Sequence, residues 1–169
     1  YRIIDFVLNN FINSGFFKIK VLTQYKSDSL NKHISKGWAL SPFLNQYVDL
    51  VPAQMRTGGA WYQGTADAVY QNAFHIHDEE PDYVCVFGGD HIYKMDYSKM
   101  LRAHVENGAS CTIAAINVTM QEASRFGILN TREDGTIYEF EEKPKQPKST
   151  LASMGIYIFT AQKLYDYLE

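Results

Sequence analysis

A buried strand that runs straight into two glycines and a carboxylate constrains the fold of this chain more than any other feature. The strand is Tyr83–Phe87, and Gly88, Gly89 and Asp90 follow it. In an open α/β sheet, ligands bind at the carboxyl ends of strands, where loops and helix N-termini meet. Glycines allow a sharp turn and a close approach to a ligand, and one carboxylate there can hold a hard cation such as Mg²⁺. The same residues also suit an ordinary strand-to-helix turn with a capping Asp, so the motif alone leaves both interpretations open.

Composition limits the class of protein. The chain has 169 residues, of which 46% are hydrophobic and 21% charged, which predicts one globular domain with a sizeable core. The net charge of −3 and the lack of a basic run argue against nucleic acid as a partner. No apolar stretch approaches the ~20 residues of a membrane span, and no secretory signal is visible.

The cysteines and the chain ends give two further expectations. Cys85 and Cys111 lie in apolar, strand-like runs, so we expect free buried thiols in a cytoplasmic protein, with a disulfide as the less expected alternative. The five histidines show no metal-ligand spacing with cysteine. The chain begins at Tyr1 rather than Met and ends in helix-like sequence at Glu169, which predicts an internal fragment of a longer protein.

Hydrophobic periodicity predicts helices that alternate with strands in the first part of the chain, followed by a β-rich part after residue 110. Such alternation favours a mostly parallel or mixed α/β sheet with right-handed crossovers. Gly15 should end the first helix, Thr65 and Asp96 should cap later ones, and Asp134-Gly135 should form a hairpin turn. We predict helices at 3–14, 27–36, 65–77, 97–107 and at the C-terminus, a loop at 38–63, and strands at 17–23, 47–51, 83–87, 110–118, 127–131, 136–141 and 154–159.

Four more segments place glycine or polar residues at element ends. Residues 61–68, Trp-Tyr-Gln-Gly-Thr-Ala-Asp-Ala, stand where a helix begins, a position that suits anionic ligands. In residues 140–144, Phe-Glu-Glu-Lys-Pro, a lysine before proline should be extended and aimed outward, available to a sugar phosphate. Residues 124–128 and 152–157 put small residues at strand entries. Taken alone, each segment also fits a purely structural role, such as a capped loop for residues 61–68 or a solvated charge cluster for residues 140–144.

In this order, the motifs closely resemble those of the bacterial glucose-1-phosphate adenylyltransferases. The specific segments are Trp-Tyr-Gln-Gly-Thr-Ala-Asp-Ala and Gly-Asp-His-Ile-Tyr-Lys-Met-Asp-Tyr, joined by Gln24-Tyr25, Phe126-Gly127, Glu141-Glu142-Lys143-Pro144 and Ser153-Met154-Gly155. The resemblance covers the chain from Tyr1 to its end. It implies a Rossmann-like nucleotide-diphospho-sugar transferase fold, incomplete at both ends, with residues 1–169 forming part of the catalytic domain.

The resemblance also implies a role for each matching residue. Asp90 would bind Mg²⁺ and act in catalysis together with Lys143. The predicted contacts of glucose 1-phosphate are Tyr62, Gly127, Glu142, Lys143 and Ser153, and those of the adenine nucleotide are Gln24 and Gly64. Arg2 lies beside a stretch that serves allosteric effectors in this family. The implied enzyme is a cytoplasmic homotetramer that makes ADP-glucose and pyrophosphate from ATP and glucose 1-phosphate in glycogen or starch biosynthesis.

The family's glycine-rich loop, its second metal-binding aspartate and its C-terminal β-helix would lie beyond the ends of the sequence, so we expect little or no activity from this segment alone.

Three alternative functions remain at this stage. A pyrophosphorylase for another sugar nucleotide would share most of the motifs. A non-catalytic regulatory subunit could have lost Asp90, Glu142 and Lys143, and their retention argues against it. A metal-dependent glycosyltransferase would require two aspartates in an Asp-x-Asp arrangement, whereas Gly89-Asp90-His91 contains a single carboxylate.

Overall fold

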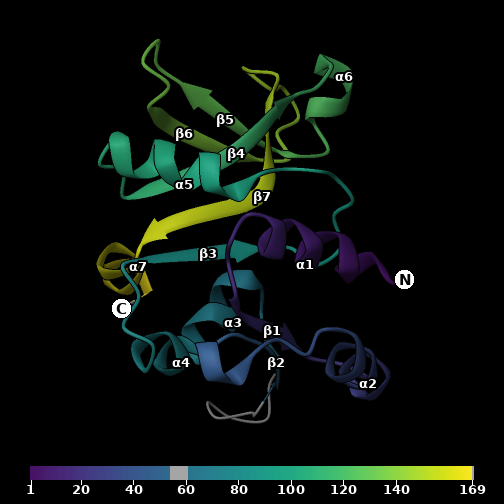
Figure 1. Ribbon diagram of the computed structural model, residues 1–169. Helices are drawn as coiled ribbons and strands as arrows, with labels where there is room; N and C mark the ends of the chain where they lie inside the picture. The colour runs from purple at the N-terminus through teal and green to yellow at the C-terminus, as the bar shows by residue number, and fades with distance from the viewer. Residues whose placement is uncertain (54–60, 169) are drawn as a thin grey trace. The chain divides into compact units, whose positions relative to one another are not determined.

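The computed structural model describes residues 1–53 and 61–168, and the chain divides into two compact units. The first unit comprises residues 1–82, 89–99 and 164–169, and the second comprises residues 83–88 and 100–163. Figure 1 shows the helices and strands of both. The predicted loop at 38–63 is described only up to residue 53 and from residue 61, since 54–60 lie outside the described residues, as does Glu169.

Helix α1, Ile3–Asn13, anchors the core of the first unit. Hydrophobic periodicity predicts an apolar face of Ile4, Val7, Leu8, Phe11 and Ile12. Val7, Leu8 and Phe11 are buried, as predicted, and Ile4 and Ile12 are partly buried. The Phe11 ring packs edge-on against Tyr97, with the ring centroids 4.9 Å apart. The helix ends at Ser14, and Gly15 follows with φ +84, the left-handed conformation for which glycine is suited.

The first unit contains one pair of parallel strands, β1 (Lys18–Thr23) and β2 (Tyr47–Pro52). Helix α2, Asp28–Gly37, and the short 3₁₀ helix η1, Pro42–Leu44, connect them. Gly37 is therefore the last residue of α2 and not a residue beyond it, and Trp38 is the C-cap. The carboxyl end of β1 leads directly into Gln24, as the strand prediction required.

The predicted helix at 65–77 is interrupted. The structure has α3, Thr65–Gln71, and α4, Ala73–His77, with Asn72 between them at φ −111. The Asn72 side chain bonds to the Ala68 carbonyl, and its backbone N–H turns to the Val69 carbonyl, so the regular helical pattern stops there. Gly64, not Thr65, is the N-cap. The buried face that periodicity predicts for this helix is Ala66, Val69, Tyr70, Ala73 and His77. Val69 is buried and Ala73 partly buried, whereas the other three residues are exposed.

The second unit is a five-stranded sheet that is organised by strand β7, Leu151–Thr160. β7 pairs antiparallel with β3 (Tyr83–Phe87), β4 (Cys111–Asn117) and β5 (Gly127–Thr131), and β6 (Ile137–Glu142) pairs with β5. β7 begins three residues earlier than predicted. Gly155 has φ +66, and the pairing of β4 with β7 shifts register between Ile113 and Ala115, which identifies a bulge.

The sheet prediction is confirmed only in its general form. Parallel and antiparallel pairing both occur, but among the described strands the β1–β2 pair is parallel and the other pairings are antiparallel. The antiparallel pairing of β5 and β6 has a local cause, because the Asp134-Gly135 turn joins the two strands as a hairpin, with Gly135 at φ +84. For β3 the reason is non-local: its partner β7 comes more than 60 residues later in the chain.

The remaining helices show one confirmed cap and one that the sequence analysis missed. Asp96 accepts hydrogen bonds from the Ser98 N–H and hydroxyl at the start of α5, Tyr97–Glu106. Thr119 and Glu122 form a capping box around α6, Met120–Ala123, which a Thr-x-x-Glu pattern could have indicated. Helix α7, Ala161–Leu168, closes the described chain. Within the described residues, no helix has the length and apolar character that crossing a membrane requires.

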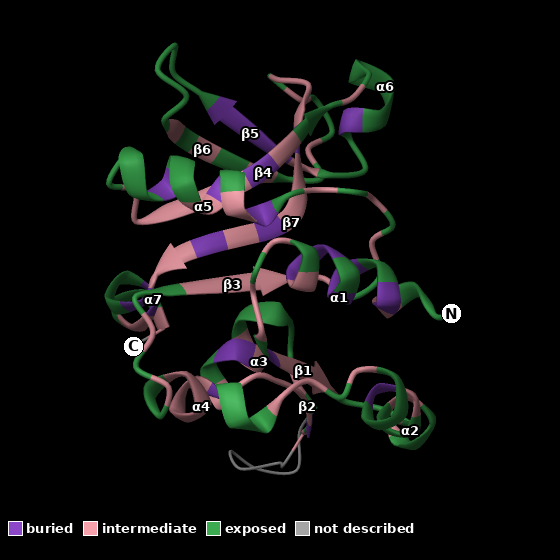
Figure 2. Ribbon diagram, in the orientation of Figure 1, coloured by how far each residue is buried: buried purple, intermediate pink, exposed green. Residues whose placement is uncertain are grey.

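The second unit buries apolar residues on both sides of β7. Ile156 and Ile158 are fully buried, and Ala123, Ile128 and Ala152 form a cluster beside Val118 (Figure 2). Both cysteines are free, as predicted. Burial raises the pKa of Cys85 to about 12 and that of Cys111 to about 11, so neither thiol is a nucleophile at neutral pH.

His104 is a buried polar residue of the second unit, with both ring nitrogens hydrogen-bonded. The Thr160 hydroxyl donates its single hydrogen to the Ala109 carbonyl at 2.9 Å, so it must accept from His104 Nε2 at 3.1 Å. Nδ1 of His104 lies 2.8 Å from the Thr112 hydroxyl and accepts its hydrogen when the ring is neutral. Desolvation lowers the pKa of His104, which favours this neutral form.

We predict that His104 makes stability depend on pH. A lowered pKa in the folded state means that the unfolded state binds more protons below the unfolded value of about 6.5. The contribution of neutral His104 to the free energy of unfolding is fully present above that pH. It is lost as the pH falls toward the lowered pKa of the folded state, and the free energy of unfolding then changes by up to about 1.4 kcal/mol per pH unit. Urea unfolding between pH 8 and pH 5 measures it. His104→Gln, whose amide can both donate and accept, should flatten the curve; an equal slope in both proteins would contradict the assignment.

Candidate functional site

The residues predicted from the sequence to bind ligands fall into two groups, one in each unit. Gln24, Tyr62, Gly64, Asp90 and Arg2 belong to the first unit. The second unit holds Gly127, Glu142, Lys143 and Ser153. Each group is described by itself.

Asp90 follows β3 after the two glycines and is strongly exposed, with a side-chain relative accessibility of 85%. Its Oδ1 lies 3.6 Å from His91 Nε2. Neither Gly88 nor Gly89 has a positive φ, so the turn does not require glycine for its backbone conformation. A Cβ added at Gly89 would meet only Ile4 Cδ1, at 3.8 Å. A small side chain at position 89 would therefore make only an ordinary van der Waals contact.

The donor set around Asp90 bears on the predicted metal. Among the described residues there is no group of three or more His, Cys, Asp or Glu side chains that could hold a metal ion. A solvent-accessible single carboxylate suits Mg²⁺ that arrives with substrate phosphates, because Mg²⁺ keeps several waters and uses one or two carboxylates. It does not suit a structural zinc or calcium ion, which needs more protein ligands.

Tyr62 and Gly64 lie in the segment that leads into α3. Two hydrogen bonds hold this segment and the helix together: the Gln63 N–H donates to Asp67 Oδ2 at 2.8 Å, and Gln71 Nε2 donates to the same oxygen at 3.0 Å. Tyr62 is partly buried, and its hydroxyl lies 2.9 Å from Asn72 Nδ2. Nothing lies within 4 Å of a Cβ added at Gly64, so the space beside that backbone is open.

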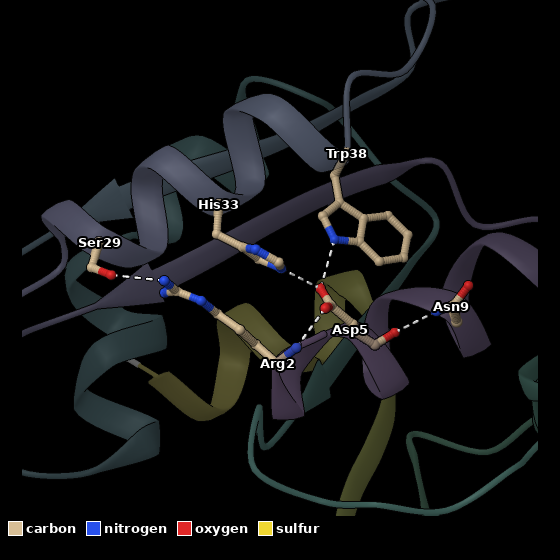
Figure 3. A network of polar contacts seen from close by, with 6 residues as sticks. All are labelled: Arg2, Asp5, Asn9, Ser29, His33 and Trp38. Atoms are coloured by element: carbon tan, nitrogen blue, oxygen red, sulfur yellow. Dashed lines mark hydrogen bonds and ion pairs between the residues drawn. The ribbon is translucent and has the colours of Figure 1, made fainter.

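Arg2 is held at the start of α1 by a network centred on the buried carboxylate of Asp5 (Figure 3). Asp5 accepts hydrogen bonds from the Arg2 N–H at 2.7 Å, from His33 Nε2 at 2.7 Å and from Trp38 Nε1 at 2.8 Å. Desolvation raises the pKa of Asp5, but these three donors outweigh it and the pKa is lowered. The Arg2 guanidinium donates to Ser29 Oγ at 2.7 Å. Arg2 is thus connected to both ends of α2.

In the second unit, three of the predicted residues form a row across adjacent strands. Gly127 on β5 pairs with Glu142 on β6. Ile128 pairs with Ala152 on β7, so the antiparallel geometry puts Gly127 next to Ser153. Residues directly opposite each other project from the same face of a sheet. The sheet therefore brings Ser153, Gly127 and Glu142 together.

Lys143 departs from its predicted conformation. We expected an extended backbone before proline, whereas Lys143 has φ +47, in the left-handed region. Its N–H donates to the Phe126 carbonyl at 3.1 Å, which continues the β5–β6 pairing by one bond before the chain turns away. That tertiary bond outweighs the local preference of a residue before proline. The ammonium group lies 3.4 Å from Glu142 Oε1, and both side chains are more than half exposed.

Comparison with known proteins decides the family. The family model described as nucleotidyl transferase matches residues 1–169, the whole chain. The chain belongs to the nucleotidyl transferase family.

The similar curated proteins share one name. The chain is 54% identical to the glucose-1-phosphate adenylyltransferase of Anaeromyxobacter sp. (strain Fw109-5), over 97% of this chain and 42% of that protein. It is 57% identical to the glucose-1-phosphate adenylyltransferase of Clostridium perfringens (strain 13 / Type A), over 100% of the chain and 44% of the relative. It is 50% identical to glucose-1-phosphate adenylyltransferase 1 of Vibrio parahaemolyticus, over 99% of the chain and 43% of the relative. The chain thus spans less than half the length of these relatives.

The sequence analysis missed three residues of the second unit: Phe140, which lies beside this row, and Asn130 and Lys148, which contact the opposite face of β6. The Phe140 ring fills the space above Gly127: a Cβ added there would collide with the ring and would lie 3.1 Å from Glu142 Oε2. Because side chains of a strand alternate between its two faces, the sequence of β6 could have predicted that Phe140 lies on the same face as Glu142.

The opposite face of β6 carries a polar network. Asn130, which is 3% exposed, donates hydrogen bonds to Glu139 and Glu141, and Lys148 Nζ lies 2.9 Å from Glu139 Oε2. Lys148 thereby ties the segment after Lys143 back to β6.

We predict that Gly127→Ala weakens the binding of glucose 1-phosphate, the ligand predicted from the sequence. The half-exposed Phe140 ring can turn aside, so the free energy of unfolding should change by less than about 1 kcal/mol. The Glu142 carboxylate must move as well, and losing one hydrogen bond to a charged group corresponds to a roughly tenfold or larger increase in Kd.

Calorimetric titration and urea unfolding measure the two effects separately. Gly37→Ala is the matched control, because nothing lies within 4 Å of a Cβ there and φ is not positive. Unchanged affinity in Gly127→Ala would remove the row from the ligand site.

Proposed function

We propose that the chain is part of the catalytic domain of a glucose-1-phosphate adenylyltransferase, which makes ADP-glucose and pyrophosphate from ATP and glucose 1-phosphate. The observation that carries the proposal is the 50–57% identity over almost the whole chain to relatives with that name. The proposal includes the nucleotide-diphospho-sugar transferase fold with its Rossmann-like sheet, a cytoplasmic homotetramer, and a role in glycogen or starch biosynthesis. Because the chain covers 42–44% of those relatives, the activity is proposed for the complete protein.

The chemistry needs little from the protein beyond charge and position. The attacking group is a phosphate oxygen of the sugar, which is already an anion, so no general base or protein nucleophile is required. The difficulty is electrostatic, since two like unit charges about 4 Å apart repel by roughly 4 kcal/mol at an effective dielectric of 20. Groups that neutralise the two phosphates and fix their approach therefore account for catalysis.

The described residues supply such groups. The ammonium of Lys143 would bind the phosphate of glucose 1-phosphate, and Glu142 would accept hydrogen bonds from hydroxyl groups of the sugar. The row of Ser153, Gly127 and Glu142 supports this assignment, because it offers a hydroxyl and a carboxylate on either side of a glycine. Gln24 and Gly64 would lie beside the nucleotide.

Asp90 would hold the Mg²⁺ ion, which offsets the negative charge of the nucleotide phosphates when bound. The exposure of its side chain supports this role. Arg2, tied to Asp5 and Ser29, would connect the start of α1 to an effector site.

We predict that Asp90→Asn lowers turnover of the complete protein by roughly a hundredfold or more, the order found when one electrostatic stabiliser is removed. The fold should be unaffected, because the side chain is exposed and the substitution is isosteric, so Tm should stay within a few degrees. Pyrophosphate release at saturating ATP, glucose 1-phosphate and Mg²⁺ measures turnover. Near-normal turnover would exclude Asp90 from catalysis.

We predict that Lys143→Ala mainly raises the KM for glucose 1-phosphate, by about ten- to a hundredfold, with the KM for ATP unchanged. The loss of one charge-assisted hydrogen bond to phosphate, about 1.5–3 kcal/mol, gives this magnitude. Lys145→Ala, at an exposed lysine two residues further on, is the matched control and should leave both values unchanged.

The same assay tests the proposed function itself. Run with a panel of nucleotides and sugar phosphates, it should give the highest kcat/KM for ATP with glucose 1-phosphate. A preference for UTP, dTTP or GTP would assign another pyrophosphorylase, and no pyrophosphate release with any pair would assign a regulatory subunit. A rise in the KM for ATP alone in Lys143→Ala would contradict the placement of Lys143 at the sugar phosphate.

A further inference from the structure

Asn72 is a buried amide in the first unit that the reaction as described so far does not use. It stands between α3 and α4 and is 5% exposed. A buried polar side chain is almost always hydrogen-bonded, and losing its partners costs stability. Its partners therefore indicate what the residue does.

The direction of its hydrogen bonds is determined by one of those partners. Asn72 Nδ2 lies 2.8 Å from the Ala68 carbonyl oxygen and 2.9 Å from the Tyr62 hydroxyl oxygen. A carbonyl oxygen can only accept, so the atom of Asn72 that faces it must be the amide nitrogen and not the amide oxygen. That nitrogen has two hydrogens, and the two contacts use both. The Tyr62 oxygen must then be an acceptor of the second hydrogen.

This arrangement leaves the phenolic hydrogen of Tyr62 free to donate elsewhere. A phenol has one hydrogen, and Asn72 has no hydrogen-bonding capacity for it on the nitrogen side. Within residues 1–53 and 61–168, Asn72 is the one hydrogen-bond partner found for the Tyr62 hydroxyl. Tyr62 is therefore set to donate to an acceptor that is not part of the described chain.

The backbone around Tyr62 is fixed as well. The next residue, Gln63, donates its N–H to Asp67 in the first turn of α3. The interruption of the helix at Asn72 is what allows its side chain to reach Tyr62 as well as Ala68. The backbone and the hydroxyl of Tyr62 are thus held by two different residues of the same helical segment.

We infer that Asn72 is a positioning residue that makes the Tyr62 hydroxyl a hydrogen-bond donor to an oxygen of glucose 1-phosphate. The inference rests on the proposed function, which assigns Tyr62 to this substrate. Phosphate oxygens are strong acceptors without hydrogens of their own at neutral pH, so a fixed donor is the matching group. Asn72 acts through Tyr62 and does not itself contact the substrate.

The test is a double-mutant cycle in the complete protein that contains this chain. Tyr62→Phe removes the donated hydrogen and should raise the KM for glucose 1-phosphate by about tenfold, with the KM for ATP within about twofold. Asn72→Asp is isosteric but cannot donate, so the phenol would turn its hydrogen toward the carboxylate; the KM for glucose 1-phosphate should rise to a similar extent. The double variant should resemble Tyr62→Phe alone, because the second change no longer has a hydroxyl to orient.

Asn72→Ala serves as the second variant if the carboxylate of Asn72→Asp, facing the Ala68 carbonyl, prevents folding. Its effect on the KM for glucose 1-phosphate should also vanish in the Tyr62→Phe background. Asn107→Ala is the matched control, since Asn107 Nδ2 donates in the same way to the carbonyl four residues earlier, Ala103, at 2.8 Å, and no hydrogen bond joins it to a tyrosine of the described residues. It should change neither KM.

The outcomes separate the inference from the proposed function. If Asn72→Ala raises the KM equally with and without the Tyr62 hydroxyl, Asn72 only supports the fold and the inference is overturned while the activity stands. If the wild-type protein neither binds glucose 1-phosphate nor releases pyrophosphate, the proposed function fails and the inference falls with it.

Discussion

The pairing of β7 with three other strands is the constraint on which the second unit depends. β7 bonds to β3, β4 and β5, and β5 in turn bonds to β6. Removing any other strand would leave a sheet, whereas without β7 the remaining strands would separate into single strands and one hairpin. Its fully buried residues Ile156 and Ile158 also supply a large part of the apolar core. The row of Ser153, Gly127 and Glu142 exists because β7, β5 and β6 are neighbours.

In the first unit, a comparable role falls to one buried carboxylate. Asp5 accepts three hydrogen bonds, and these come from the start of α1, from α2 and from the residue that caps α2 (Figure 3). A buried charge persists only when it is paired or fully hydrogen-bonded, so these three donors and the carboxylate require one another. The position of Arg2, and with it any effector site at this helix, follows from the same network.

Much of the fold that surrounds the candidate site could be predicted from sequence because it depends on local signals. The strand before Asp90, the α1 face of Val7, Leu8 and Phe11, and the turn at Asp134-Gly135 depend on residues a few positions apart. The left-handed backbone of Lys143 could not be predicted, because its N–H bonds to the carbonyl of Phe126, the residue that precedes β5. Asn72 was missed for the same kind of reason, because its hydrogen bond joins it to Tyr62 ten residues earlier, and Phe140 matters only because the sheet puts it above Gly127.

The sequence by itself determined which chemical groups the chain carries and where most helices and strands form, since caps, turns and hydrophobic periodicity act over a few neighbouring residues. The short helix α6 and the interruption at Asn72 were not predicted. The order of the motifs was also sufficient to indicate the nucleotidyl transferase family. Only the tertiary structure decided which strands pair, that antiparallel pairing predominates, and which way the hydrogens of Asn72 and His104 point. Those features depend on partners tens of residues away or on hydrogen-bond directions, and a pattern read along the chain contains neither.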